Sequence, residues 1–146
     1  MAVADLTLPE LQAWGQRFGA SLRAPACVTL TGDLGAGKTT LVQAITTGLG
    51  VRDEVTSPTY SIVHRYEAPT GDVWHFDLYR LKRVDELAQV GWDDALASGG
   101  IVLVEWPEIA ATQLPPAHIA LQLEHLPGDA ERRRLRAPET SVGARA

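Results

Sequence analysis

A glycine-rich octapeptide constrains this chain more than any other feature. Residues 32–39 read GDLGAGKT and match the pattern G-x-x-x-x-G-K-[ST]. Glycines let successive backbone N–H groups turn inward without a Cβ clash, and the positive end of the next helix adds to the concavity they form. Such a concavity holds the phosphates of a nucleoside triphosphate. The alternative is a simple glycine-rich turn, but the pattern arises by chance in roughly fewer than one in a hundred chains of this length.

The flanking residues supply the setting that a phosphate loop needs. The segment 27–31 is apolar and β-branched, as in a strand, and a helix is expected over 38–49, with Gly50 as its stop. In this setting Lys38 would neutralise the β- and γ-phosphates, and the Thr39 hydroxyl would bind Mg²⁺. The predicted nucleotide-binding residues of the loop are Asp33, Leu34, Gly35, Ala36, Gly37, Lys38, Thr39 and Thr40.

The 146 residues suit a single α/β domain of the P-loop NTPase type, with a mixed β-sheet flanked by helices. We expect this domain to span residues 1–136 and a disordered tail to span 137–146. Helices are expected over 9–23 and over 84–98, the second one broken near Gly91. Further strands are expected over 3–8, 61–66, 73–79, 101–104, 119–123 and 131–136.

A phosphate-loop enzyme also needs an acid at the end of a neighbouring strand. Glu105, which closes the apolar run 101–104, is the best candidate, and Asp77 is the second. The alternative for either residue is a simple ion pair with an arginine such as Arg80. We expect His75, two residues before Asp77, to lie near solvent.

Composition narrows the class of protein. The formal net charge of −5 argues against a stand-alone RNA or DNA binder. The run Arg132–Arg136 is expected to be a solvated strand face, with contact to a nucleotide or to RNA as the alternative. The single cysteine, Cys27, excludes an internal disulfide and is expected to be a small buried residue. With no apolar run long enough for a membrane and no signal-like start, the cytoplasm is the expected location.

Three classes of phosphate-loop protein remain to be compared. A Ras-type GTPase needs an N-K-x-D motif, which a chain without asparagine cannot contain. A nucleotide kinase needs an arginine-bearing lid, for which the region between Thr40 and Glu105 has little room. A small ATPase that drives a partner needs neither. A small phosphotransferase and a nucleotide-gated assembly module stay open as alternatives.

Four blocks of sequence together resemble the TsaE family, also called YjeE. They are GDLGAGKTT at 32–40, SPTY at 57–60, HFDLYRL at 75–81 and VEWP at 104–107, and the resemblance extends over residues 5–136. The resemblance implies a bacterial ATPase of tRNA threonylcarbamoyladenosine biosynthesis that binds ATP and Mg²⁺ and hydrolyses ATP slowly when alone. It also implies action on the transferase complex of TsaD and TsaB, with tRNA contacted only indirectly through that complex.

The resemblance assigns roles to particular residues. It implies that Thr39 and Glu105 are the Mg²⁺ ligands and that Asp77 is needed for hydrolysis, so that Lys38, Asp77 and Glu105 form the catalytic set. Three further residues are implied in nucleotide binding: Thr59 in a loop that senses the γ-phosphate, Trp106 at the rim of the site, and Thr7 near the adenine.

Overall fold

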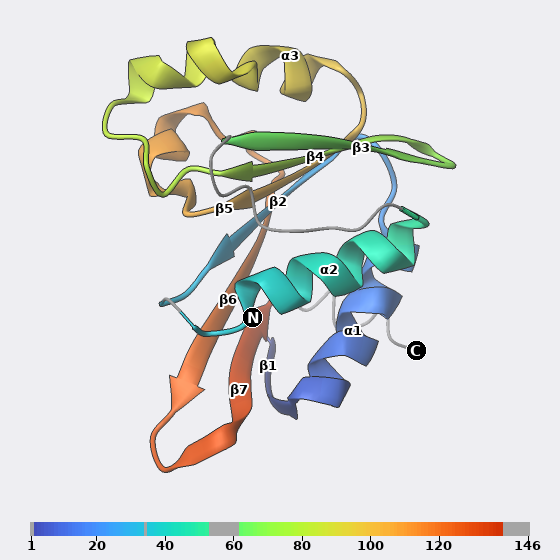
Figure 1. The fold of residues 1–146 in the computed structure, drawn as a ribbon, viewed down its shortest axis with the longest axis vertical. Coiled ribbons are helices and arrows are strands. Elements are labelled where there is room, and N and C mark those ends of the chain that lie inside the picture. Colours follow the sequence, from blue (N-terminus) through green and yellow to red (C-terminus); the bar gives the residue numbers. More distant parts are fainter. Residues whose placement is uncertain (1, 34, 53–61, 139–146) are drawn as a thin grey trace.

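The computed structural model describes residues 2–33, 35–52 and 62–138, and in them one seven-stranded sheet carries helices on both faces (Figure 1). The strand order is β1-β7-β6-β2-β5-β4-β3. The elements, in chain order, are β1 (Ala2–Thr7), α1 (Leu8–Ser21), β2 (Ala26–Thr31), α2 (Lys38–Leu49), β3 (Val63–Ala68), β4 (Gly71–Asp77), the 3₁₀ helix η1 (Val84–Val90), α3 (Trp92–Ala97), β5 (Ile101–Glu105), the 3₁₀ helix η2 (Pro107–Gln113), β6 (Ile119–Leu126) and β7 (Asp129–Ala137).

The centre of the sheet is parallel and its two edges are antiparallel. Strand β5 pairs in parallel with β2 and β4, and β2 also pairs in parallel with β6. Strands β7 and β1 extend one edge, and β3 extends the other, in antiparallel pairs. Because parallel strands end at one edge of a sheet, the carboxyl ends of β2, β5 and β4 lie side by side, with Asp77 opposite Glu105 in register.

Alternation along the strands sends side chains to two separate cores. On one face Val28 and Leu103 pack with α1 and α2, and on the other Phe76 and Val104 pack with η1, α3 and η2 (Figure 1). The contact of α1 with α2 requires glycine, because a Cβ built on Gly19 would lie 2.1 Å from a carbonyl oxygen of α2. None of the helices within the described residues combines the length and apolar character needed to cross a bilayer.

Most elements agree with the sequence expectations, and the differences are local. The helix over 38–49 is confirmed, and the segment 84–98 divides at Gly91, whose φ of 78° ends η1 before α3 begins. Strand β6 pairs antiparallel with β7, as its alternating pattern indicates, but it also pairs in parallel with β2 on its other side. Ala137, expected in the tail, is buried and ends β7, while residues 139–146 lie outside the described part.

Candidate active site

The phosphate loop connects β2 to α2 and depends on glycine backbone geometry. Gly32, Gly35 and Gly37 all have positive φ, at 149°, 78° and 102°. A Cβ on Gly32 would lie 2.5 Å from the Leu123 carbonyl oxygen, so this turn excludes any larger residue. Gly37 directly precedes α2 and has no side chain to cap it, which leaves the first amides of α2 available to an anion. Leu34 lies outside the described residues.

Lys38 begins α2 and turns its ammonium back into the loop. The side chain is 6% exposed, its Nζ donates a hydrogen bond to the Gly32 carbonyl, and the same atom lies 3.4 Å from the centre of the Trp106 ring. Burial lowers the pKa of Lys38, and Glu105 and Asp77 act in the opposite direction by stabilising the charged form. The loop therefore holds one largely desolvated cation facing two carboxylates.

Trp106 follows Glu105 and closes one side of this space. It is the one described non-glycine residue with a left-handed backbone, at φ 54°, immediately before η2 begins at Pro107. Its ring lies over Lys38 and contacts the ring of Tyr79, with centroids 4.9 Å apart. The unusual backbone directs the indole across the loop, where it shields the lysine from water.

The carboxyl ends of β4 and β5 and the start of α2 enclose a cavity of about 350 Å³. It brings together most of the predicted phosphate and metal residues, which are Gly35, Gly37, Lys38, Thr39, Thr40, Asp77, Glu105 and Trp106. Thr59, a further predicted site residue, lies outside the described residues, and Asp33 lies in a neighbouring cavity on the other side of Trp106.

The donor set of this cavity fits Mg²⁺ rather than a metal held by protein ligands alone. Thr39 offers a hydroxyl oxygen, and Glu105 and Asp77 offer carboxylates. Within the described ranges no group of three or more His, Cys, Asp or Glu side chains could hold a metal ion. Mg²⁺ is commonly bound by one or two carboxylates, water and substrate phosphates, so a hydroxyl and one acid suffice once a triphosphate is present.

The surroundings of the two acids differ from the sequence expectation. Glu105 is 3% exposed, and its Oε2 lies 2.6 Å from Nε2 of His75, which is completely buried. The expectation that His75 lies near solvent is therefore wrong, because both faces of β4 are covered at this position. The partner seen for Glu105 is this histidine rather than an arginine. Asp77 accepts a hydrogen bond from the Tyr79 amide at 3.1 Å.

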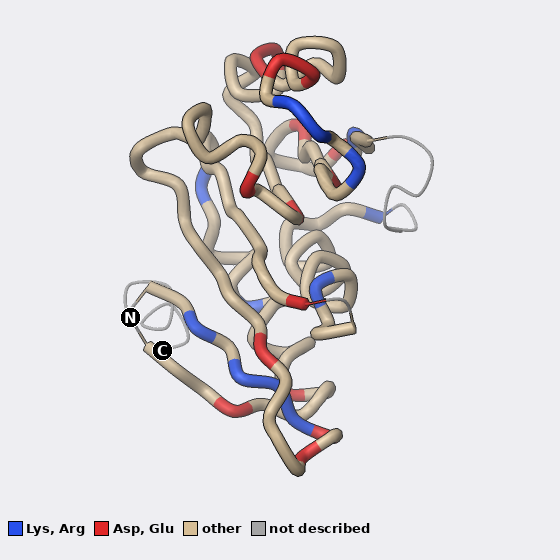
Figure 2. Tube along the Cα trace, turned by 90° about the vertical axis from the view of Figure 1, so that its left-hand side faces the viewer, with Lys and Arg blue, Asp and Glu red and all other residues tan. Residues whose placement is uncertain are grey.

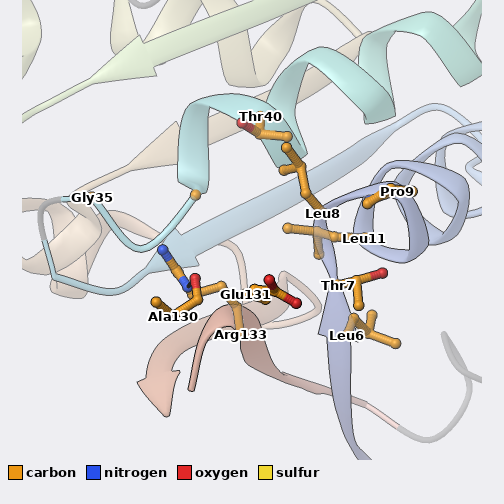
Figure 3. Close-up of a pocket in the computed structure, with 11 residues that line it drawn as sticks. Leu6, Thr7, Leu8, Pro9, Leu11, Gly35, Thr40, Ala130, Glu131 and Arg133 are labelled. Carbon is orange, nitrogen blue, oxygen red and sulfur yellow. Dashed lines mark hydrogen bonds between the residues drawn. The ribbon is translucent and has the colours of Figure 1, made fainter. Parts of the chain in front are cut away.

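A second cavity, of about 490 Å³, opens from the same loop toward α1 (Figure 3). Its walls are largely apolar where β1 passes into α1, at Leu6, Leu8, Pro9 and Leu11. It shares Gly35, Gly37 and Thr40 with the phosphate cavity, so one extended ligand can occupy both. Planar aromatic ligands favour apolar walls of this kind.

Thr7, the residue implied near the adenine, lies in the wall of this second cavity. It caps α1: its Oγ1 accepts from the Glu10 amide at 3.4 Å, and its own amide donates to the Glu10 carboxylate at 2.9 Å. The hydrogen bond from this amide lowers the pKa of Glu10. The Thr7 hydroxyl hydrogen is not used in the cap, so the side chain can still donate to a ligand.

Arg133 lines the wall of this second cavity. The sequence predicted a solvated strand face for the whole run Arg132–Arg136, with contact to a nucleotide or to RNA as the alternative. Figure 2 shows basic residues along β7 beside acidic ones, and three of the basic residues form ion pairs, Arg132 with Asp129, Arg134 with Asp5 and Arg136 with Glu124. Arg133 instead points toward the phosphate loop (Figure 3). Its Nη1 donates to the Ala130 and Arg132 carbonyls, and its buried Nε has no hydrogen-bond partner among the described residues. The alternation of β7 could have revealed this, because Arg133 shares its face with buried Leu135.

The chain is similar to known proteins over most of its length. Residues 7–135 match the family described as "Threonylcarbamoyl adenosine biosynthesis protein TsaE". The chain belongs to the TsaE family. The match covers every described residue named above for the two cavities except Leu6, so the phosphate loop, the paired strand ends and nearly all of the apolar pocket lie within the matched region.

Individual relatives cover most of the chain. A protein of Synechocystis named "tRNA threonylcarbamoyladenosine biosynthesis protein TsaE" is 40% identical over 76% of this chain and 74% of its own length. A protein of the same name from Haemophilus influenzae is 42% identical over 67% of this chain and 62% of its own length. The crystal structure of YdiB from Bacillus subtilis covers 99% of this chain and 93% of that one, with 26% identity and a TM-score of 0.70. The expected P-loop NTPase fold is confirmed.

Proposed function

We propose that this chain is a Mg²⁺-dependent ATPase required for tRNA threonylcarbamoyladenosine formation, in which it supports turnover of a TsaB–TsaD transferase complex. The observation that carries the proposal is the convergence of Lys38, Thr39 and Glu105 on one cavity that continues into an apolar pocket, in a chain of the TsaE family. The cytoplasm, where tRNA is modified, is the proposed location.

The shape of the two cavities supports a nucleoside triphosphate as the ligand. The base occupies the apolar pocket beside Thr7 and Leu11, and the phosphates follow the loop past Gly35 and Gly37. The amides at the start of α2 bind phosphate oxygens, and Lys38 leaves the Gly32 carbonyl to neutralise the β- and γ-phosphates. Adenine is proposed as the base from the family rather than from the loop, which contacts only phosphates.

The metal and the attacking water are assigned to the strand ends. Thr39 and Glu105 would hold Mg²⁺, which would neutralise the negative charge that develops on the phosphates during transfer. Asp77, opposite Glu105 in register, is on the same wall and orients the water that attacks the γ-phosphate. Trp106 excludes bulk water from the reacting end, which strengthens each of these electrostatic interactions.

Slow turnover of the isolated protein follows from the residues around the phosphates. No arginine is among the described residues that line the phosphate cavity. An arginine finger contributes about 10³–10⁵ in rate where one is present, so the described lining of the phosphate cavity lacks this accelerating group. A partner that supplies or orders such a group explains why hydrolysis is tied to the transferase complex. The acidic net charge of −5 leaves tRNA binding to that complex.

The experiment compares ATP hydrolysis by the protein alone and with a purified TsaB–TsaD complex. We expect slow hydrolysis alone, clear stimulation by the complex, and loss of the stimulated rate in Lys38→Ala. The matched control is Lys82→Ala, which changes the one other lysine of the chain, an exposed residue. An unchanged stimulated rate in Lys38→Ala would refute the phosphate-loop assignment. ATP-dependent association with the complex without hydrolysis would instead favour a nucleotide-gated assembly module.

A further inference from the structure

His75 is a completely buried polar residue for which the proposed mechanism has no use so far. It lies on β4 between β3 and β5, and its register partner on β5 is Leu103. Alternation places Val73, His75 and Asp77 on the face of β4 that is covered by α2. Valine and leucine occupy the neighbouring core positions on this face. Packing alone therefore does not explain why this position carries an imidazole.

The ring makes its hydrogen bond with the proposed metal ligand. Nε2 of His75 lies 2.6 Å from Oε2 of Glu105. An ionised carboxylate only accepts, so Nε2 carries the hydrogen and donates it. Nδ1 is buried and has no partner in the part of the chain that the structure describes, so a hydrogen on Nδ1 would be left without an acceptor. Both observations favour the tautomer with its hydrogen on Nε2.

We propose that His75 is a positioning residue that fixes the orientation of the Glu105 carboxylate for the cation. The imidazole engages Oε2 and leaves Oε1 to face the cavity that Thr39 also lines. A buried glutamate has several rotamers, and a fixed donor on one oxygen selects the rotamer that presents the other. Residues that hydrogen-bond a metal ligand, without contacting the metal, typically contribute tenfold to a hundredfold in metal affinity or activity. This proposal rests on the function proposed above.

The test separates the hydrogen-bond donor of the His75 ring from the space that the ring fills. His75→Gln keeps an N–H near the position of Nε2, while His75→Leu fills similar space without a donor. For each protein, calorimetry measures the affinity for a non-hydrolysable ATP analogue in EDTA and in excess Mg²⁺, and the ratio of the two affinities reports the contribution of the metal. We expect the three proteins to agree within about threefold in EDTA. In His75→Leu the gain from Mg²⁺ should fall about tenfold or more, and His75→Gln should restore most of it.

The outcomes distinguish this inference from the proposed function. If the wild-type protein binds the analogue in neither buffer, the proposed function fails. If it binds, and folded His75→Leu keeps the full gain from Mg²⁺ or His75→Gln loses as much as His75→Leu, the positioning role is refuted. Thermal unfolding shows whether each variant is folded. Should the leucine variant not fold, ¹⁵N spectra of the wild-type histidines decide: a hydrogen on Nε2 of His75 supports the proposal, and a hydrogen on Nδ1 overturns it.

Discussion

Arg133 and Arg134 are neighbours on β7 with opposite surroundings, and replacing each in turn tests how the apolar pocket is used. Arg133 lines the pocket and points toward the phosphate loop (Figure 3), whereas Arg134 forms an exposed ion pair with Asp5 on the other face of the strand. We choose methionine for both replacements, because it keeps an unbranched apolar stem and removes the guanidinium group with its charge and donors. The expected result is that Arg133→Met weakens nucleotide binding and Arg134→Met does not.

The magnitude follows from the groups that each side chain has available. Arg133 uses Nη1 for two backbone carbonyls, while its buried Nε has no partner in the described part of the chain. A hydrogen bond that involves a charged group is worth about 1.5–3 kcal/mol. The loss of one such bond to the ribose or a phosphate corresponds to roughly a tenfold to hundredfold weaker affinity. For Arg134 the ion pair is open to solvent, and exposed pairs of this kind contribute little to stability.

Calorimetric titration with MgATP at one ionic strength measures both variants against the wild type. Because a general loss of positive charge would weaken anion binding in the two variants alike, Arg134→Met controls for that long-range effect. Thermal unfolding confirms that both variants are folded. Equal affinities for the two variants, whether both lowered or both unchanged, would show that the direction of Arg133 into the pocket has no consequence for nucleotide binding.

Three further predictions concern other parts of the molecule. Asp77→Ala should keep ATP affinity within about threefold and lower the partner-stimulated hydrolysis rate by about a hundredfold or more, as for loss of a group that orients or activates the attacking water; unchanged hydrolysis would move this role elsewhere. Gly19→Ala should lower the free energy of unfolding by about 2 kcal/mol in a denaturant titration, because a Cβ 2.1 Å from the Ile45 carbonyl oxygen outweighs the better helix propensity of alanine; a more stable variant would contradict the close helix contact. Burial raises the pKa of Cys27 from 9.0 to about 11. The folded state therefore keeps its thiol proton where the unfolded state loses it, so this residue's contribution to stability is complete below pH 9.0 and is lost as the pH rises to about 11. Cys27→Ala should flatten that part of the pH–stability curve, and an unchanged curve would refute the raised pKa of the Cys27 thiol.

The parts of the site that could be predicted are those governed by local rules. The octapeptide determines the loop and the start of α2, and an acid that closes a buried strand belongs at the carboxyl edge of a parallel sheet, which is where Glu105 lies. The stripe of α1 predicts its buried face because a helix repeats every 3.6 residues whatever its partner. These features need only a few neighbouring residues to be recognised.

The parts that could not be predicted depend on pairing between distant segments. The contact of His75 with Glu105 exists because β4 lies beside β5 in one particular register, which no local pattern specifies. The apolar pocket combines the junction of β1 and α1 with the start of β7, residues more than a hundred positions apart. A histidine between apolar residues and an arginine within a basic run look the same in sequence whether they face solvent or a cavity. The order and register of the strands determine whether such a residue faces solvent or a cavity.

The charges gathered at the strand ends explain why nucleotide and metal should bind together. Lys38 is the cation that lines the phosphate cavity within the described residues, and it faces Glu105 and Asp77. A triphosphate would bring several more negative charges into this cavity, where repulsion from the two carboxylates exceeds what one ammonium can offset. A divalent cation reverses that balance, so each ligand should tighten the binding of the other by the same factor. The orientation of Glu105 then matters for both ligands. Loss of the His75 contact to Glu105 should therefore appear as lost coupling between Mg²⁺ and nucleotide, with little change in the binding of nucleotide alone.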